Sequence, residues 1–214
     1  MKLHTYFRSS AAFRVRIALN LKGLPFDAVP VHLLRDGGEQ HRAAYRALNP
    51  LGVVPVLQDG PQVLTQSLAI IEYLDETHPE PALLPTTPAE RARVRAIAQA
   101  IACDIHPVNN LRVLQYLKRT LGHTQDEVDT WYRHWVDLGL AAVEQLLADH
   151  PQTGRFCHGD TPGLADCCLL PQVFNACRYH CSLDAMPTVQ RIAAACEALP
   201  AFAAALPANQ PDAE

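Results

Sequence analysis

Residues 8–19 read RSSAAFRVRIAL, and they join a short apolar run, Leu3 to Phe7, to an apolar stretch with helical spacing. Two adjacent hydroxyl side chains, Ser9 and Ser10, stand at this junction, and serine is a preferred residue for capping a helix N-terminus. A strand that leads directly into a capped helix is typical of α/β domains. We therefore predict that the chain opens with a β-strand and an α-helix.

The same alternation of short apolar runs and amphipathic stretches continues to Tyr73. Asp59-Gly60 is a turn signal between two short apolar runs, which indicates a hairpin. The order predicted for this half is β-α-β-α-β-β-α. After the first strand and helix, its elements are expected at residues 26–33, 40–48, 53–57, 63–64 and from Gln66-Ser67 to Leu74.

One predicted strand, Val53 to Leu57, contains Pro55, and proline cannot donate a hydrogen bond to a central ladder. One interpretation is an edge strand. The other is a cis Val54-Pro55 bond that turns the backbone of Val54 toward a ligand. The residues of this stretch favour neither interpretation.

The second half of the chain has a helical pattern throughout. Residues 79–88 are rich in proline and form the clearest linker. Beyond it, apolar residues keep helical spacing over lengths too great for strands, and Thr87 and Thr124 each begin a capping-box pattern. We predict an α/β domain over 1–81 and an all-helical domain over 87–214, with the alanine-rich tail after Pro200 loosely held.

Composition favours a small-molecule partner. The formal net charge is −4 and the Lys and Arg residues are scattered, which argues against binding to nucleic acid or an acidic membrane. Because the first residues contain no apolar signal region and no apolar run reaches membrane-spanning length, we expect a cytoplasmic protein.

Seven cysteines form an odd set without the regular spacing of a disulfide framework, so we expect reduced thiols that are buried as small apolar side chains. Cys177, His180 and Cys181 lack a second pair of ligands at zinc-site spacing, and no metal site is predicted. A dithiol oxidoreductase is disfavoured because the chain has no C-x-x-C motif.

Arg8, Ser9 and Ser10 lie together at a predicted helix start. Unpaired backbone N–H groups and the helix dipole make this end electropositive, and a favourable anion contact there contributes up to about 1 kcal/mol. Capping alone explains the serines, but it does not explain Arg8. Ser67 follows Gln66 at a second helix start, where its hydroxyl either caps the helix or holds a carboxylate.

Several motifs together resemble the zeta class of glutathione transferases, and the resemblance spans essentially the whole chain. In addition to residues 8–19, the motifs are Asn49-Pro50, Val54-Pro55, Gln66 to Ile70, Asp104 to Pro107, Asn109 to Arg112, Gly159-Asp160, Leu164 to Asp166, Pro171 to Val173 and Gln210-Pro211. The resemblance implies a thioredoxin-like domain joined to a helical domain, a homodimer, and glutathione bound between the two domains.

The resemblance also implies roles for single residues. Ser9 is expected to hold the glutathione sulfur as a thiolate, with Ser10 and Arg8 completing the catalytic set. Arg8, Arg112 and Arg178 are expected to face a dicarboxylate substrate, although the sequence pattern by itself favours an ordinary solvated helix face for Arg112 and Arg178. The implied glutathione-binding residues are Ser9, Ser10, Gln40, His41, Val54, Gln66, Ser67, His106, Asn110, Leu111 and Arg112.

Two residues depart from the family pattern. Ala11 replaces a cysteine that many zeta enzymes carry after the two serines, so no redox role of that cysteine is expected. Gly163 stands where relatives often have a Ser or Thr helix cap, at a cost of only a few tenths of a kcal/mol.

The activity that the resemblance implies is glutathione-dependent cis–trans isomerisation of maleyl keto acids. The thiolate would add to a cis double bond and leave after rotation. Maleylacetoacetate, from the breakdown of aromatic amino acids, is the first choice of substrate, and maleylpyruvate, from the gentisate pathway, is the alternative. A general transferase for apolar electrophiles and a non-catalytic glutathione-binding module are the competing interpretations.

Overall fold

A computed structural model describes all of residues 1–214. Its contacts divide into two units: the N-terminal unit comprises residues 1–83 together with 198–214, and the helical unit comprises residues 84–197. The predicted domains, 1–81 and 87–214, stay a prediction, but the final residues group with the N-terminal unit. No helix has the length and apolar character needed to cross a membrane.

The N-terminal unit is built on a four-stranded sheet in the order β2-β1-β3-β4. Its strands are β1 (Lys2–Thr5), β2 (Asp27–Pro30), β3 (Val56–Asp59) and β4 (Gln62–Thr65). β1 pairs parallel with β2 and antiparallel with β3, while β3 and β4 form the predicted hairpin, closed at Asp59 and Gln62. Gly60 in the hairpin turn has a φ of 53°, a conformation that glycine adopts without a steric penalty.

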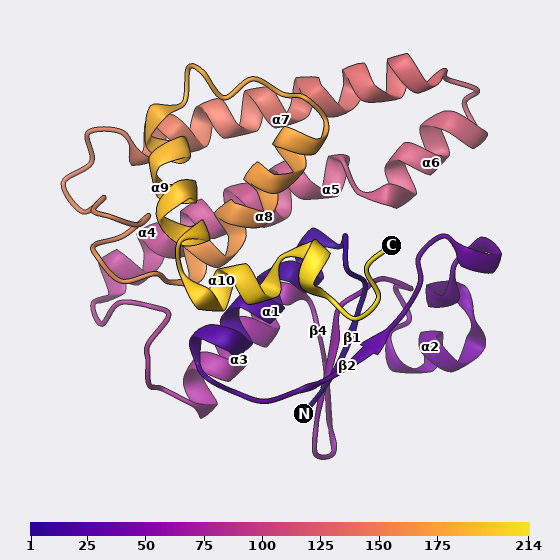
Figure 1. Ribbon diagram of the computed structural model, residues 1–214, viewed down its shortest axis with the longest axis horizontal. Coiled ribbons are helices and arrows are strands. Elements are labelled where there is room, and N and C mark those ends of the chain that lie inside the picture. The colour runs from indigo at the N-terminus through magenta and orange to yellow at the C-terminus, as the bar shows by residue number, and fades with distance from the viewer. The chain divides into compact units, whose positions relative to one another are not determined.

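Helices of the N-terminal unit cover both faces of this sheet (Figure 1). They are α1 (Ser10–Leu21), α2 (Ala43–Leu48), α3 (Ser67–Thr77) and α10 (Pro200–Ala205), with short 3₁₀ turns at Arg35–Gly37, Glu39–His41 and Pro207–Asn209. α1 packs against α3 and α10, and α2 lies on the opposite side of the sheet. The thioredoxin-like element order β-α-β-α-β-β-α is therefore confirmed.

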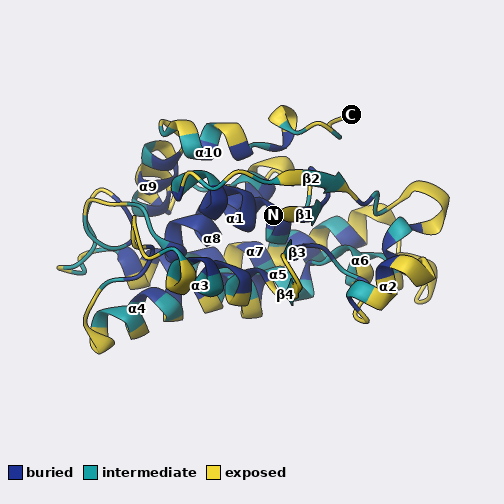
Figure 2. Cartoon of the chain, turned by 90° about the horizontal axis from the view of Figure 1, so that it is seen from below, coloured by how far each residue is buried: buried dark blue, intermediate teal, exposed yellow.

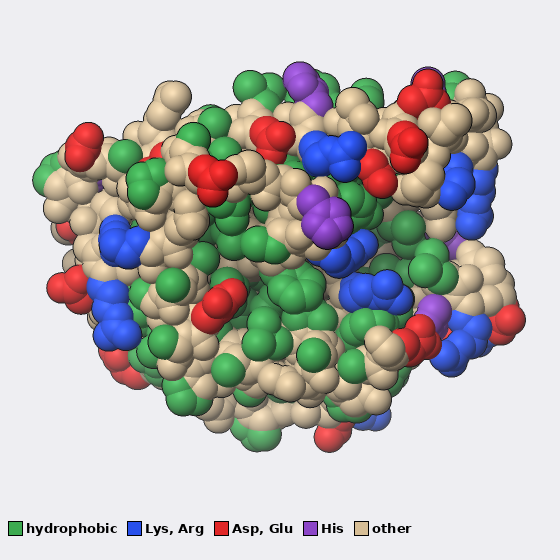
Figure 3. All heavy atoms as spheres, turned by 45° about the horizontal axis from the view of Figure 1, so that its top comes forward, with side chains coloured by type: hydrophobic (Ala, Val, Ile, Leu, Met, Phe, Trp, Pro, Cys, Tyr) green, Lys and Arg blue, Asp and Glu red, His purple; other side chains and the backbone are tan.

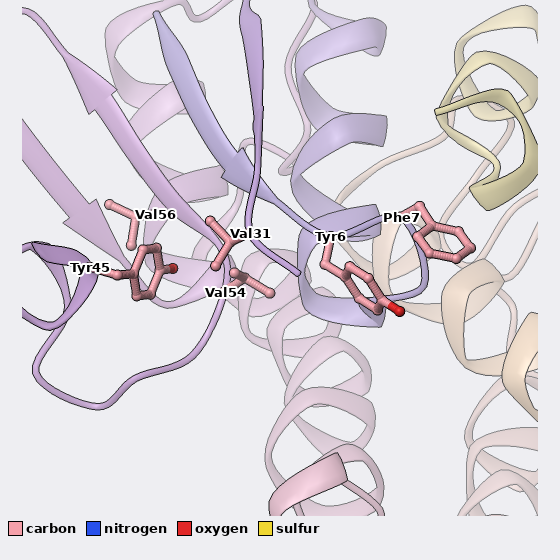
Figure 4. Packing of buried hydrophobic residues seen from close by; sticks show 6 residues of the cluster. All are labelled: Tyr6, Phe7, Val31, Tyr45, Val54 and Val56. Carbon is pink, nitrogen blue, oxygen red and sulfur yellow. The ribbon is translucent and has the colours of Figure 1, made fainter. Parts of the chain in front are cut away.

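Pro55 immediately precedes β3, and the Val54-Pro55 peptide bond is cis. β3 hydrogen-bonds to a neighbour on each side, so the edge-strand interpretation is wrong. Val54 instead packs with Tyr6, Val31, Tyr45 and Val56 in a buried cluster on one face of the sheet (Figure 4).

The alanine-rich tail is not loosely held, contrary to the expectation. Phe202 and Ala205 of α10 are fully buried, and Asn20 of α1 donates to the carbonyl of Ala201 at 2.9 Å. Small alanine side chains allow α10 to approach α1 closely, so the composition that suggested mobility instead permits tight packing.

The helical unit contains only helices and connecting segments, as predicted. These are α4 (Pro88–Gln99), a π-helical segment (Ala100–Ile105), α5 (His106–Val108), α6 (Leu111–Arg119), α7 (Gln125–Leu147), α8 (Leu164–Arg178) and α9 (Pro187–Glu197). Thr87 and Thr124 cap α4 and α7 as expected, each accepting from the N–H of a glutamate three residues later. α8 is buried along almost its whole length (Figure 2).

Charged side chains of both signs are interspersed on the face of the molecule drawn in Figure 3. Acidic groups lie near basic ones there, so this face presents no extended field of one sign.

Candidate active site

Ser9 is the N-cap of α1. Its Oγ accepts a hydrogen bond from the N–H of Ala12 at 3.2 Å, which leaves the hydroxyl proton able to donate to another group. Ser10, the first residue of the helix, is 4% exposed. The capping interpretation of the serine pair is thus confirmed for Ser9. A hydroxyl that caps a helix N-terminus is also placed to bind an anion.

Arg8 is exposed, but its guanidinium contacts neighbouring aromatic rings. Its carbon Cζ lies 4.7 Å from the centre of the Phe7 ring and 6.0 Å from that of Tyr6. Such cation–π contacts contribute about 0.5–1 kcal/mol at exposed sites. They hold a positive charge one residue ahead of Ser9.

Ser67 begins α3, but it does not cap it. The N-cap is Gln66, whose side chain makes no capping hydrogen bond, and the Ser67 Oγ accepts from Nη1 of Arg14 at 3.2 Å. The capping interpretation of Ser67 is therefore wrong. Gln66 has a φ of 68°, which is strained for a residue with a side chain and costs on the order of 1–3 kcal/mol.

Gln40 and His41 lie beside the segment that leads to Val54. A Cβ on Gly52 would stand 3.2 Å from the carbonyl oxygen of Gln40 and 3.5 Å from Nδ1 of His41. The Gln40 amide donates to the carbonyl of Leu33 at 3.2 Å, while its Oε1 is buried and has no hydrogen-bond partner. An unpartnered buried acceptor is costly, so this atom is suited to receive a donor from a ligand.

In the helical unit, the structure brings His106, Asn110, Leu111 and Arg112 together around one turn. Asn110 caps α6 by accepting from the N–H of Arg112 at 3.2 Å, and its amide lies 3.4 Å from Nε2 of His106. Arg112 itself is exposed in the first turn of α6.

Arg178 ends α8 and is also exposed, with its Cζ 4.9 Å from the centre of the Tyr179 ring. Tyr179 stacks on Tyr132 at 3.6 Å, and the Tyr132 carbonyl accepts from the amide of Asn109 at 3.3 Å. Arg178 and the turn at Asn109 are therefore connected through Tyr132 of α7.

Two arginines that sequence reasoning did not single out are buried in α1. Arg14 is 2% exposed and bonds to Ser67, while Arg16 is 0% exposed. Burial lowers the pKa of Arg16 to about 10, so the group stays protonated at neutral pH. Two charged residues inside the apolar run Phe13 to Leu19 were the available signal, because arginine is almost never fully buried without partners.

The cysteines do not contribute to this site. All seven are free, as expected, and five of them are buried, but Cys103 and Cys177 are exposed, contrary to the expectation. Burial raises the pKa values of Cys157 and Cys167 and thereby disfavours their reactive thiolate forms. No group of three His, Cys, Asp or Glu side chains is arranged to hold a metal ion.

Comparisons with known proteins agree with this architecture. The family described as the N-terminal domain of glutathione S-transferases matches residues 3–82. A probable maleylacetoacetate isomerase from Vibrio cholerae is 54% identical over 211 residues, which cover 99% of this chain and 97% of the relative.

Two solved structures are also very similar. The holo structure of a maleylpyruvate isomerase, described as a bacterial zeta-class glutathione S-transferase, has a TM-score of 0.97 and 48% identity, with 100% of each chain covered. The maleylacetoacetate isomerase of Methylobacterium extorquens AM1, with bound malonate and GSH, has a TM-score of 0.96 and 43% identity over 100% of both chains. The chain therefore belongs to the glutathione transferase family, and within it to the zeta class that contains these isomerases.

Proposed function

We propose that this protein is a glutathione-dependent cis–trans isomerase of maleyl keto acids. The observation that carries the proposal is the placement of the Ser9 hydroxyl at the N-terminus of α1, with the Arg8 cation beside it. Relatives with this architecture and about half of their residues in common bear the names of such isomerases.

The residues of the N-terminal unit fit glutathione. The N-terminus of α1 and the Ser9 hydroxyl both favour an ionised sulfur, and the buried Gln40 Oε1 has no partner within the chain. Ser67, supported by the Arg14 cation, is suited to hold a carboxylate at the start of α3. Gln40, His41, Val54 and Gln66 are the residues that we propose line the tripeptide.

When bound, glutathione supplies a thiolate that adds reversibly to the cis double bond of the substrate, which frees that bond to rotate. Ser9 donates its hydroxyl proton toward the sulfur and so lowers the pKa of the thiol. Ser10 is buried beside it in the first turn of α1. The chain thus holds the sulfur ionised and leaves the covalent chemistry to the tripeptide.

A maleyl keto acid carries two carboxylates, and we assign them to Arg8, Arg112 and Arg178. Each guanidinium is exposed, and Arg8 and Arg178 are restrained by neighbouring aromatic rings. Planar guanidinium groups bind carboxylates in a bidentate manner. The bound malonate of the Methylobacterium relative is a small dicarboxylate, which supports a diacid substrate here.

Maleylacetoacetate is the proposed substrate, because two relatives at 54% identity are named as a maleylacetoacetate isomerase or a probable one. Maleylpyruvate is the second candidate, favoured by the similarity to the maleylpyruvate isomerase structure. We further propose a cytoplasmic homodimer, with His106, Asn110 and Leu111 contributing to the glutathione site.

The direct test mixes purified protein with each keto acid, with and without glutathione, and follows the enone absorbance. The expected result is isomerisation that requires glutathione and is faster with maleylacetoacetate. Ser182→Ala is a matched control for Ser9→Ala, because Ser182 bonds only to Asp184 on the surface. Turnover of chlorodinitrobenzene but of neither keto acid would indicate a general transferase. Glutathione binding without turnover of any of these substrates would indicate a binding module.

A further inference from the structure

Arg16 lies at the centre of a hydrogen-bond network under the loop that carries Arg8 and Ser9. Its guanidinium is fully buried and donates to four oxygens of the N-terminal unit. The acceptors are the Ala205 carbonyl at 3.2 Å, Thr5 Oγ1 at 3.0 Å, the Tyr6 carbonyl at 3.4 Å and the Phe7 carbonyl at 3.0 Å. Arg16 therefore fixes two successive peptide groups just before Arg8.

Asp212 binds the same loop through a second backbone group. Its Oδ2 accepts a hydrogen bond from the N–H of Phe7 at 3.0 Å, although 205 positions separate the two residues in the sequence. The negative charge of Asp212 also acts on Arg16, where it raises the pKa against the lowering caused by burial. Figure 1 shows the C-terminal residues passing close to the end of β1.

The backbone at Phe7 needs these two side chains because the sheet no longer supports it. β1 ends at Thr5, and α1 begins only at Ser10. Between these elements, Asp212 binds the N–H of Phe7 and Arg16 binds its carbonyl. Both polar backbone groups of Phe7 are thus satisfied by side chains, one from the following helix α1 and one from the C-terminal segment.

The position of Phe7 and Tyr6 is passed on directly to the candidate active site. The Phe7 ring supports the guanidinium of Arg8, and the carbonyl of Tyr6 accepts from the N–H of Ser9 at 2.9 Å. Figure 4 shows Phe7 at the end of the buried cluster, away from Tyr45 and Val56. A displacement of this loop would therefore move both Arg8 and Ser9.

We propose that Asp212 and Arg16 are positioning residues of the active site, which clamp the Tyr6-Phe7 backbone and so set where Arg8 and Ser9 meet their ligands. This inference rests on the proposed function for what those ligands are. Neither residue is proposed to touch a ligand, and each acts through the loop. Through Asp212, the C-terminal segment thereby helps to position the active site of the N-terminal unit.

Asp212 is the better residue to test, because removing the buried Arg16 risks unfolding. Asp212→Ala removes the acceptor of the Phe7 N–H and the charge that acts on Arg16, whereas Asp212→Asn keeps an acceptor oxygen. Glu214→Ala is the matched control, since Glu214 lies in the same tail but contacts His32 at 3.1 Å and Arg35 at 3.2 Å. Three quantities are compared with wild type: the KM for the keto acid, the pKa of the bound glutathione thiol, and hydrogen exchange of residues 6–12.

In Asp212→Ala we expect faster exchange in residues 6–12, a higher thiol pKa and a KM for the keto acid raised about tenfold, as for the loss of a hydrogen bond to a charged group. Asp212→Asn should recover most of the KM, and Glu214→Ala should match wild type. The positioning role is wrong if Asp212→Ala lowers only the melting temperature. It is also wrong if the KM of Asp212→Asn is as high as that of Asp212→Ala. A wild-type protein without isomerase activity would instead overturn the proposed function, while the exchange data would still report on the clamp.

Discussion

The candidate ligand-binding side chains at the start of α1 and those of the exposed arginines in the helical unit are held in place in different ways. Ser9 caps helix α1, and the loop that precedes this helix is bound by the buried side chain of Arg16 and by Asp212. Arg178 is held by the Tyr179 ring and by two long hydrogen bonds, one of 3.3 Å to the Tyr179 hydroxyl and one of 3.5 Å to Asn175. The first region is a fixed backbone arrangement, and the second presents charges on long side chains.

This difference suggests a division of labour. A reacting sulfur needs donors placed within a few tenths of an ångström, which buried networks provide. A carboxylate can be bound by a long side chain that adapts to substrates of different length. We therefore expect Ser9 to control the chemical step, and the exposed arginines, which are Arg112 and Arg178 of the helical unit together with Arg8, to control affinity for the diacid.

The largest effect is expected for Ser9→Ala. It removes the hydroxyl donor to the sulfur, and loss of one such donor lowers kcat about a hundredfold. Steady-state kinetics at saturating glutathione measure this, with Ser182→Ala as the control. A Ser9→Ala enzyme with unchanged kcat would break the comparison, because the fixed region would then have no chemical role.

Arg178→Ala is expected to act on binding instead. The loss of one charge-assisted hydrogen bond raises the KM for the keto acid about tenfold, with little change in the KM for glutathione. Arg178→Lys keeps the charge but lacks the planar guanidinium group, so its KM for the keto acid should lie between those of the wild type and Arg178→Ala. Equal changes in both KM values would contradict the carboxylate assignment.

Ser67→Ala sharpens the comparison within the N-terminal unit. It removes the oxygen that Arg14 donates to, and a ligand carboxylate loses its hydroxyl partner at the start of α3. Calorimetry is expected to show a dissociation constant for glutathione raised about fivefold, from a loss of roughly 1 kcal/mol. Ser67→Thr keeps the hydroxyl and should restore binding; a Thr variant as weak as Ala would argue against this contact.

The smallest kinetic effect is expected for Glu144→Gln in the helical unit. Glu144 is 8% exposed and accepts from the N–H groups of Thr188 and Val189 at 3.0 and 2.8 Å, at the start of α9. Losing the charge should lower the free energy of unfolding by about 1 kcal/mol in denaturant titrations and leave kcat and KM unchanged. Glu197→Gln, at the exposed end of the same helix, serves as the control.

Periodicity and caps were enough to predict the order of elements and the helical second half. Strands and helices here are local patterns, and residues such as Thr87, Thr124 and Ser9 mark helix starts through contacts within one turn. Local signals of this kind can be read from the sequence because both partners lie within a few residues of each other.

The contacts that fix the site are not local, which is why sequence reasoning missed them. The acceptors of Arg16 are contributed by β1, the following loop and α10, and Asp212 reaches Phe7 from the other end of the chain. For Pro55, the pattern allowed two conformations, and only the strand order decides against an edge position. The tail after Pro200 was misjudged because alanine content indicates neither mobility nor close packing by itself.

The most direct measurement is a titration of the bound glutathione thiol, followed by the ultraviolet absorbance of the thiolate. We expect the thiol pKa in the wild-type complex to lie well below that of free glutathione, and the value in the Ser9→Ala complex to shift back toward that of the free thiol. The same pKa in both complexes would contradict the claim that Ser9 at the start of α1 keeps the sulfur ionised.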